Sequence, residues 1–280
     1  MAPLHMASLQ PKNKSFGFYV EYGFILAGGN PSVKQEKLFA KLSLIDDSVL
    51  ILDDIFDNSI SRNGKPCLHR THGIQHASIT AQKYQSQAYD CLYDLMLESK
   101  TGEPFQIKIL KKFSEFIDQI NIGQGIDLEL SKIRIYSPKL LSRYFVMIKT
   151  FTGGHIKYAL EIGQLLAHKN VDSKLSKEAE SLGIIRQIVD DFDDYFDAHH
   201  EPFGDLISGA NRLPEILFKK RKGNLSAVLN YIKNRKYSEA RNIVLNTSIR
   251  KELYFYCKKE DKKIHSKLRR LIENYDKILI

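Results

Sequence analysis

Cysteine is scarce in this sequence, and no stretch of it is uniformly apolar. The 280 residues include three cysteines, Cys67, Cys91 and Cys257, whose spacing matches no metal-binding motif. Three cysteines cannot all pair, which argues against a disulfide framework and favours a reducing compartment. No run approaches the ~18 apolar residues of a membrane span, and residues 1–10 lack the features of a signal peptide. We therefore expect a cytoplasmic protein.

Strand patterns and nucleotide-binding motifs are also missing. No stretch alternates convincingly between apolar and polar residues, which leaves helices as the main element. The sequence contains no zinc finger, nucleic-acid motif or glycine-rich nucleotide loop. Its net charge of +9 alone would permit a helical protein that binds DNA or an anionic membrane. Neither class explains the acidic segments described below, so we predict no nucleic-acid partner. The basic C-terminal third could still contact a membrane surface.

Helical spacing extends through most of the chain. Ser137 and Pro138 combine an N-cap with a proline at the first helical position. Gly123 and Gly125 would each cost a helix about 1 kcal/mol, which implies close packing or a kink. We expect a flexible N-terminus at 1–15 and one all-α domain of roughly ten helices at 16–280. The expected helices are 16–26, 34–57, 73–98, 105–130, 138–155, 156–167, 176–197 and three or four basic amphipathic helices within 213–275, with a loop at 199–211.

Three aspartates follow an apolar segment that ends at Leu52. Asp53 and Asp57 are four residues apart and share a helical face, and Asp54 lies beside them. Carboxylates crowded into one turn repel one another, and a buried carboxylate needs a partner. Mg²⁺ would provide one, because it binds a few carboxylate oxygens and takes further ligands from water and phosphate. The segment therefore predicts a magnesium site.

A second acidic segment repeats this spacing with Asp190, Asp191 and Asp194. Gln187, one turn earlier, favours this set over the equally spaced alternative. Two such helices facing each other would hold several Mg²⁺ ions and a diphosphate. The alternative set is Asp193, Asp194 and Asp197.

Taken together, these segments resemble the trans-isoprenyl diphosphate synthase (polyprenyl synthetase) family. The matching pieces are DDIFDNSISRNGKPCLH, GIQHAS, GQGIDL, IKT, QIVDDFDDY and GDL…LP, in the family's order, from about residue 28 to 216. The resemblance implies a single-domain antiparallel helix bundle of the isoprenoid synthase type around a central apolar cavity, a homodimer, and three Mg²⁺ ions. It also implies that the metals remove diphosphate from an allylic prenyl diphosphate, so that an alkene attacks the resulting carbocation.

The resemblance also implies roles for individual residues. Ser48 and Val49 would floor the cavity and, being modest in size, leave room for a prenyl chain of fifteen or twenty carbons. Phe192 would line the cavity, and Gln124 and Asp127 match a mid-chain motif. Arg62 and Lys149 would bind diphosphate, assisted by Arg186 in place of the usual aromatic residue. Lys149, Thr150 and Gln187 would lie near the reacting carbons. The implied metal ligands are Asp53, Asp54, Asp57, Asp190, Asp191 and Asp194.

The departures from the family concentrate on the acceptor side. Asn63 and Asp46 replace an arginine and a histidine, and an early basic motif keeps only Lys12. These places normally bind isopentenyl diphosphate. Two lysines near the second acidic segment are replaced by Glu201 and Ala210. We therefore expect a prenyltransferase whose acceptor differs from isopentenyl diphosphate. The alternatives are a terpene synthase on the same scaffold, an ordinary geranylgeranyl-type synthase, and a non-catalytic partner subunit.

Overall fold

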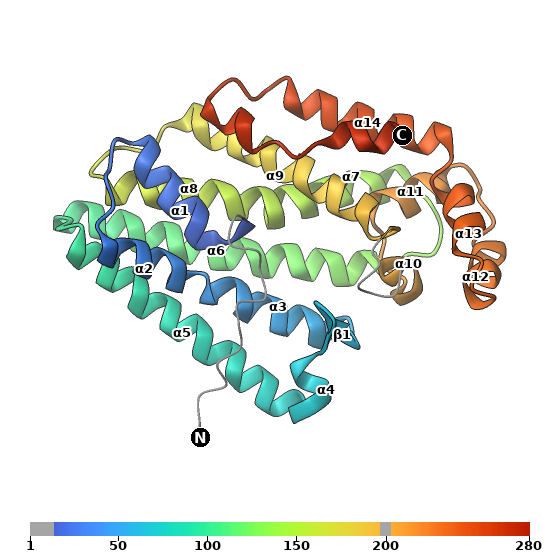
Figure 1. The fold of residues 1–280 in the computed structure, drawn as a ribbon, viewed down its shortest axis with the longest axis horizontal. Coiled ribbons are helices and arrows are strands. Elements are labelled where there is room, and N and C mark those ends of the chain that lie inside the picture. Colours follow the sequence, from blue (N-terminus) through green and yellow to red (C-terminus); the bar gives the residue numbers. More distant parts are fainter. Residues whose placement is uncertain (1–13, 197–202) are drawn as a thin grey trace. The chain divides into compact units, whose positions relative to one another are not determined.

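The computed structural model describes residues 14–196 and 203–280, which fall into two compact units. One unit comprises the described residues up to Ile117 together with Ile156–Ser176. The other comprises Asp118–His155 and the described residues of Lys177–Ile280. The all-α prediction is confirmed, since the described strands are two residues each (Figure 1). That residues 16–280 form one domain stays a prediction.

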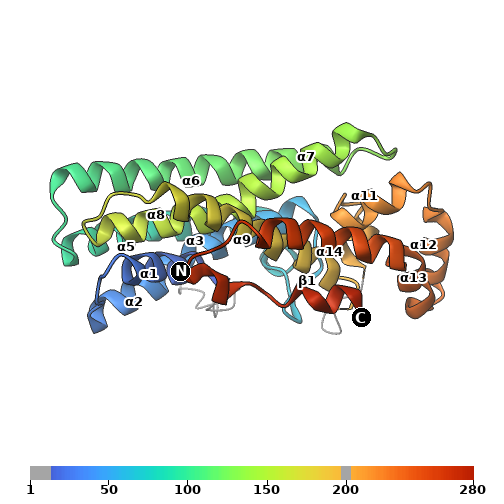
Figure 2. The same ribbon diagram turned by 90° about the horizontal axis from the view of Figure 1, so that it is seen from above.

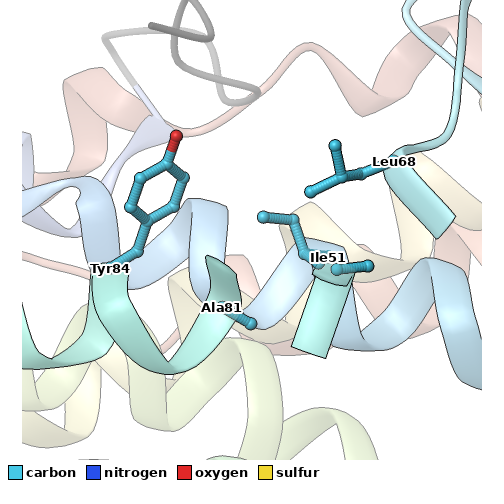
Figure 3. Packing of buried hydrophobic residues seen from close by; sticks show 5 residues of the cluster. Ile51, Leu68, Ala81 and Tyr84 are labelled. Carbon is cyan, nitrogen blue, oxygen red and sulfur yellow. The ribbon is translucent and has the colours of Figure 1, made fainter. Parts of the chain in front are cut away.

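Helices α3 and α5 carry the core beneath the first acidic segment (Figure 1). Ile51 of α3 lies next to Leu68, and Ala81 and Tyr84 of α5 complete the contact (Figure 3). Burying such a side chain contributes about 1.5–3 kcal/mol, so the core fixes this end of α3. The elements of this unit are α1 (Phe16–Leu26), α2 (Val33–Leu42), α3 (Leu44–Phe56), β1 (Ser61–Arg62), β2 (Lys65–Pro66), α4 (Leu68–His72), α5 (Ile74–Glu98), and most of α8 (Gly154–Leu166) with the first half of α6 (Glu103–Leu130).

The N-terminal part of the chain departs from two predictions. The helix expected at 34–57 is two helices, because the chain breaks at Ser43. A Cβ at Gly17 would lie 1.9 Å from the Phe39 carbonyl oxygen, so α1 packs directly against the end of α2 at this break. No proline or glycine marks the position in the sequence. Of the expected flexible segment, residues 1–13 lie outside the described residues, whereas Ser15 is the buried N-cap of α1.

The second unit contains four of the basic helices that the sequence predicts. Helices α12 and α13 lie side by side, and α14 packs against the C-terminal 3₁₀ turn (Figure 2). The expected start at Ser137–Pro138 is confirmed, since the Ser137 hydroxyl accepts from the backbone N–H of Leu140. The elements are the second half of α6, α7 (Pro138–Ile148), the π-helical turn η2 (Lys149–Gly153), most of α9 (Ser173–Asp193), α10 (Gly204–Ser208), α11 (Leu213–Lys220), α12 (Leu225–Lys233), α13 (Tyr237–Val244), α14 (Thr247–Asp261), and the 3₁₀ turns η3 (Lys267–Leu271) and η4 (Tyr275–Leu279).

A π-helical turn interrupts the helix expected at 138–155. The turn is tightly packed, because a Cβ at Gly183 of α9 would lie 2.5 Å from the Thr152 carbonyl oxygen. Gly123 of α6 is close to Phe151 in the same way, which confirms the predicted close packing for that glycine. Gly125 has open space at its Cβ position among the described residues. The loop expected at 199–211 contains the short helix α10.

The basic charge of the C-terminal helices is partly matched by nearby carboxylates. Lys220 and Arg221 both pair with Glu252, at 2.9 and 2.7 Å, and Arg269 pairs with Asp261 at 3.2 Å. None of the helices in the described part of the chain combines the length and apolar character needed to cross a lipid bilayer.

Candidate active site

The first acidic cluster consists of Asp53, Asp54 and Asp57 at the C-terminal end of α3. Asp57 is the C-cap and not an interior residue of the helix. Arg62 contacts both neighbouring acids: its Nε donates to Asp54 Oδ1 at 2.8 Å and its Nη2 to Asp53 Oδ2 at 3.1 Å. Asp54 is buried and Asp53 is partly exposed. The arginine expected to bind a diphosphate therefore lies beside the carboxylates expected to bind metal.

A β-hairpin positions Arg62. Arg62 pairs with Lys65 across the two short strands, and Asn63 and Gly64 form the turn with φ angles of +52° and +73°. Asn-Gly is the preferred sequence for a two-residue hairpin turn of this left-handed kind. This local signal was present in the sequence, where we considered Asn63 only as a replaced arginine. Arg70 fixes the preceding loop by donating to the Ser59 carbonyl at 3.1 Å.

The surroundings of Asp54 compensate its negative charge. Burial, together with a hydrogen bond from the Cys67 thiol to Asp54, raises the pKa of Cys67 to about 12. Burial lowers the pKa of Arg62, but the bonds to Asp54 and Asp53 outweigh it and raise the pKa overall. Both partners therefore keep their protons at neutral pH, and Asp54 has a permanent cation and a neutral donor beside it.

Asp46 occupies the position where the family resemblance predicts a histidine. In this structure its side chain binds the first residue of helix α1. Its buried Oδ2 accepts a hydrogen bond from the backbone N–H of Phe16 at 2.8 Å. Phe16 begins α1, where the first N–H groups lack partners within the helix and favour a negative charge. The ring of Phe16 stacks on Phe116 with centroids 4.1 Å apart. The carboxylate of Asp46 is therefore engaged by α1, a role that sequence reasoning missed because its partner is 30 residues away.

Asp191 is the most enclosed member of the second acidic cluster, Asp190, Asp191 and Asp194. It is only 2% exposed and accepts from Tyr144 Oη at 2.5 Å, Gln187 Nε2 at 2.9 Å and the Leu213 backbone N–H at 3.1 Å. Burial raises its pKa to about 6, and the rise is limited by the nearby charge of Arg212 and by the hydrogen bonds from Gln187 and Tyr144. Both oxygens of Asp191 are thus already bonded to neutral groups.

Asp190 and Asp194 have different partners from Asp191. Asp190 is more exposed and lies 3.7 Å from the guanidinium Nε of Arg186. Burial raises the pKa of Asp194 to about 8, and the nearby Asp205 contributes to the rise. Arg212 lies in the same region and pairs with Asp205 at 3.3 Å. Each acid of this cluster therefore has a cation close by, while burial disfavours the charged form of Asp194.

Sequence reasoning missed several residues around this cluster. Arg212 also bonds Asp127 at 2.6 Å, which gives the mid-chain motif a partner. Buried Tyr144 had no distinguishing signal in the sequence. Asp205 and Leu213 lie in the matched piece GDL…LP, but their contacts depend on the fold. Glu215, 2% exposed, accepts from the hydroxyl of Tyr195.

The π-helical turn presents Thr152, and not Thr150, to α9. The Thr152 hydroxyl donates to Gln187 Oε1 at 2.6 Å, and Gln187 in turn donates to Asp191. Thr150 is half-buried. Lys149 is more than half exposed and pairs with Glu180 at 3.3 Å. That Thr150 lies near the reacting carbons stays a prediction.

The remaining predicted residues are spread over the two units. Ser48 is buried and Val49 half-buried on α3, whereas Phe192 is buried against Phe196, with the Arg250 guanidinium 5.6 Å from its ring. Their assignment to a cavity stays a prediction. The half-buried residues Gln124 and Ala210 lie in the second unit. Asp193, from the alternative acidic set, pairs with Lys277 at 2.6 Å. Lys12, Asp197 and Glu201 lie outside the described residues.

Comparison with known proteins decides the family. The family model for polyprenyl synthetases matches residues 22–244, most of the chain. The chain belongs to the polyprenyl synthetase family. The resemblance seen in the acidic segments, and the fold class it implies, are confirmed.

Curated relatives match this chain over part of their length. A geranylgeranyl pyrophosphate synthase of Penicillium paxilli is 29% identical over 211 residues, which are 71% of this chain and 53% of that protein. A conidiogenone synthase of Penicillium rubens is 27% identical over 249 residues, 84% of this chain and 32% of that protein. The chain thus spans about half the length of the first curated relatives it matches, or less.

Solved polyprenyl synthetases share the isoprenoid synthase fold with this chain. The polyprenyl synthase of Caulobacter crescentus CB15, crystallised with calcium and isoprenyl diphosphate, aligns with a TM-score of 0.72 and 21% identity. The alignment covers 98% of this chain and 84% of that one. At this identity the likeness shows the fold alone.

The chemistry of the acidic side chains fits the Mg²⁺ on which this family generally depends. Carboxylate oxygens are the protein ligands that Mg²⁺ prefers, and one or two per ion suffice when phosphate supplies others. Asp53, Asp57 and Asp190 carry such oxygens at helix ends. Asp191 fits less well because both of its oxygens already accept hydrogen bonds. Within residues 14–196 and 203–280, no group of three or more acidic, histidine or cysteine side chains is arranged to hold a metal by itself.

Proposed function

We propose that this protein is a Mg²⁺-dependent prenyltransferase. It ionises an allylic prenyl diphosphate of farnesyl or geranylgeranyl size and transfers the prenyl group to an acceptor other than isopentenyl diphosphate. Family membership supports the reaction class, and the carboxylates at the ends of α3 and α9 support the metal dependence. The modest side chains of Ser48 and Val49 support the chain length. The number of ions, three by resemblance, stays a prediction.

The choice of acceptor is supported by one contact, the hydrogen bond from the Phe16 N–H to Asp46. A buried carboxylate at this point repels a diphosphate and already fills the anion position at the start of α1. The second obstacle is the missing arginine at position 63. The backbone of Asn63 is left-handed, a conformation that arginine disfavours, so this hairpin does not suit the arginine that would bind the diphosphate. An acceptor without a diphosphate avoids both obstacles.

The residues of this chain would share the work as follows. At the first cluster Asp53, Asp54 and Asp57 would hold Mg²⁺, and at the second cluster Asp190 would do so. Bound Mg²⁺ stabilises negative charge on the leaving diphosphate. Arg62 would bind the same diphosphate through its planar guanidinium. Thr152 orients Gln187 by donating to its amide oxygen, and Asp191 holds the amide nitrogen. Apolar side chains around the prenyl tail would exclude water from the carbocation.

The deciding experiment is incubation with Mg²⁺ and farnesyl or geranylgeranyl diphosphate, with and without isopentenyl diphosphate. We expect no elongated diphosphate, and turnover only when a different alkene or aromatic acceptor is added. Relative to a site that binds with micromolar affinity, a missing charged hydrogen bond and a facing carboxylate each weaken binding roughly tenfold. Calorimetry in the presence of a non-ionisable allylic analogue should therefore show a Kd for isopentenyl diphosphate above about 100 µM. Elongated products with micromolar binding would identify an ordinary geranylgeranyl-type synthase.

A terpene synthase is the second candidate, favoured by the similarity to a conidiogenone synthase over 84% of this chain. The same incubation identifies it, because hydrocarbons or alcohols would form from a single substrate. No turnover with any acceptor would favour a non-catalytic partner subunit.

We also propose that the protein is a homodimer in the cytoplasm. Exposed Tyr89, Tyr93 and Leu97 follow one another at four-residue spacing along α5, which supports an apolar contact with a second copy. Free, buried cysteines support a reducing compartment. Nothing in the comparisons supports the membrane contact that the basic charge alone would permit.

A further inference from the structure

Arg62 binds the same carboxylate oxygens that a metal at the first acidic cluster would use. One guanidinium reaches Asp54 Oδ1 at 2.8 Å and Asp53 Oδ2 at 3.1 Å. The side chain of Asp54 is 5% exposed, so solvent screens this ion pair little. A divalent cation approaching these oxygens would meet a positive charge already bonded to them. Metal binding therefore competes with Arg62.

The backbone around Arg62 is held in place, so only the side chain of Arg62 can move away from the acids. The hairpin is closed by its Asn63–Gly64 turn, and Arg70 ties the loop before it to the Ser59 carbonyl. The Arg62 side chain is long and partly exposed, with 27% of its surface accessible. It can turn away from the acids while the hairpin stays in place. A phosphate-bearing ligand would then offer the freed guanidinium a bidentate partner.

We infer that Arg62 exchanges partners, leaving Asp53 and Asp54 for the substrate diphosphate when Mg²⁺ takes their oxygens. This inference rests on the proposed function. It makes Arg62 a substrate-binding residue that couples two ligands. Metal alone must displace Arg62 without giving it a new partner, whereas metal together with diphosphate supplies one. Each ligand therefore strengthens binding of the other, as coupled sites require.

The test compares Arg62→Gln with Lys65→Gln. Lys65 is exposed, pairs with Arg62 across the hairpin, and has no bond to the acids among the described contacts, so its substitution removes the same charge without the competition. Binding of Mn²⁺ alone, followed by electron paramagnetic resonance, should tighten about tenfold in Arg62→Gln and less than threefold in Lys65→Gln. Binding of farnesyl thiolodiphosphate with Mg²⁺, followed by calorimetry, should weaken about tenfold in Arg62→Gln.

The opposite signs of the two effects identify the exchange, because a purely structural arginine would weaken both. If Arg62→Gln folds poorly, Arg62→Lys takes its place. It keeps the positive charge but not the forked guanidinium, and should give values between those of the wild type and those expected for Arg62→Gln. Mn²⁺ binding that is no tighter in Arg62→Gln than in Lys65→Gln would overturn the inference and leave the proposed function standing. Failure of wild-type protein to bind the thiolodiphosphate with Mg²⁺ would overturn the proposed function itself.

Discussion

At the end of α3 Asp54 is held by a guanidinium and a thiol, whereas within α9 Asp191 is held by three neutral donors. The two aspartates occupy the same position in identically spaced clusters. Asp54 is paired with the cation of Arg62, which a metal ion could replace. Asp191 is enclosed by hydrogen-bond donors from three different helices, so it joins those helices. Equal spacing therefore places carboxylates near one another without determining which of them can bind a metal.

The two clusters also differ in proton affinity. Arg62, whose pKa is raised by its bonds to the acids, supplies a permanent charge at the first cluster. At the second, burial raises the pKa of Asp194 to about 8 and that of Asp191 to about 6. Stability in the second unit should therefore depend on pH more strongly than stability around α3.

The largest expected effect comes from removing an acid that is open to metal. Asp53→Ala and Asp190→Ala should each lower kcat/KM by about three orders of magnitude, because stabilisation of the leaving diphosphate is lost. Far-UV circular dichroism should remain helical, and exposed Asp90→Ala serves as the control. Steady-state kinetics with Mg²⁺ measure the change. Full activity of the wild type in excess chelator would remove the metal from the mechanism.

The next effect separates the two clusters by stability. Asp191→Ala leaves the Tyr144 hydroxyl, the Gln187 amide and the Leu213 N–H without their buried acceptor. The expected loss in unfolding free energy is about 3 kcal/mol or more, since each of the three unsatisfied donors costs about 1–3 kcal/mol. Asp53→Ala, which removes a partly exposed ion pair, should lose about 1 kcal/mol or less. Urea unfolding measures both, and equal losses would contradict the contrast between the clusters.

The effect that is smallest at any one pH step concerns a buried glutamate. Burial raises the pKa of Glu215 to about 8 from an ordinary 4.5, so the folded protein keeps a proton that the unfolded chain releases in this interval. The unfolding free energy should therefore fall as pH rises from 4.5 to 8, by on the order of 1 kcal/mol per pH unit. Glu215→Gln cannot release this proton and should show a flatter profile in urea unfolding measured across this range.

Glu252→Gln is the matched control with the opposite sign. Burial raises the pKa of Glu252, but hydrogen bonds from Lys220 and Arg221 outweigh it and lower the pKa overall. Its stabilising contribution is present above pH 4.5 and is lost as pH falls below that value. Glu252→Gln should thus be less stable than wild type at pH 7 and approach it in acid. Parallel profiles for Glu215→Gln and wild type would show that Glu215 does not titrate in this interval.

Local features of this protein were determined by the sequence itself. The all-α class, the helix start at Ser137–Pro138 and the position of both acidic clusters at helix ends follow from spacing, capping and breaker residues. The hairpin at Asn63–Gly64 belongs here as well, because its turn preference is encoded in two adjacent residues. Such features depend on neighbours within one or two turns, so they can be predicted without the fold.

Other features were decided by tertiary structure. The break at Ser43 arises where α1 packs against α2, and the π-helical turn places Thr152 against Gln187 of α9 where Gly183 approaches. Asp46 and Asp191 are buried beside partners that lie 30 and 47 residues away, respectively. Burial and choice of partner depend on segments distant along the chain, and they set whether a carboxylate caps a helix, holds a hydrogen-bond network or is open to a metal.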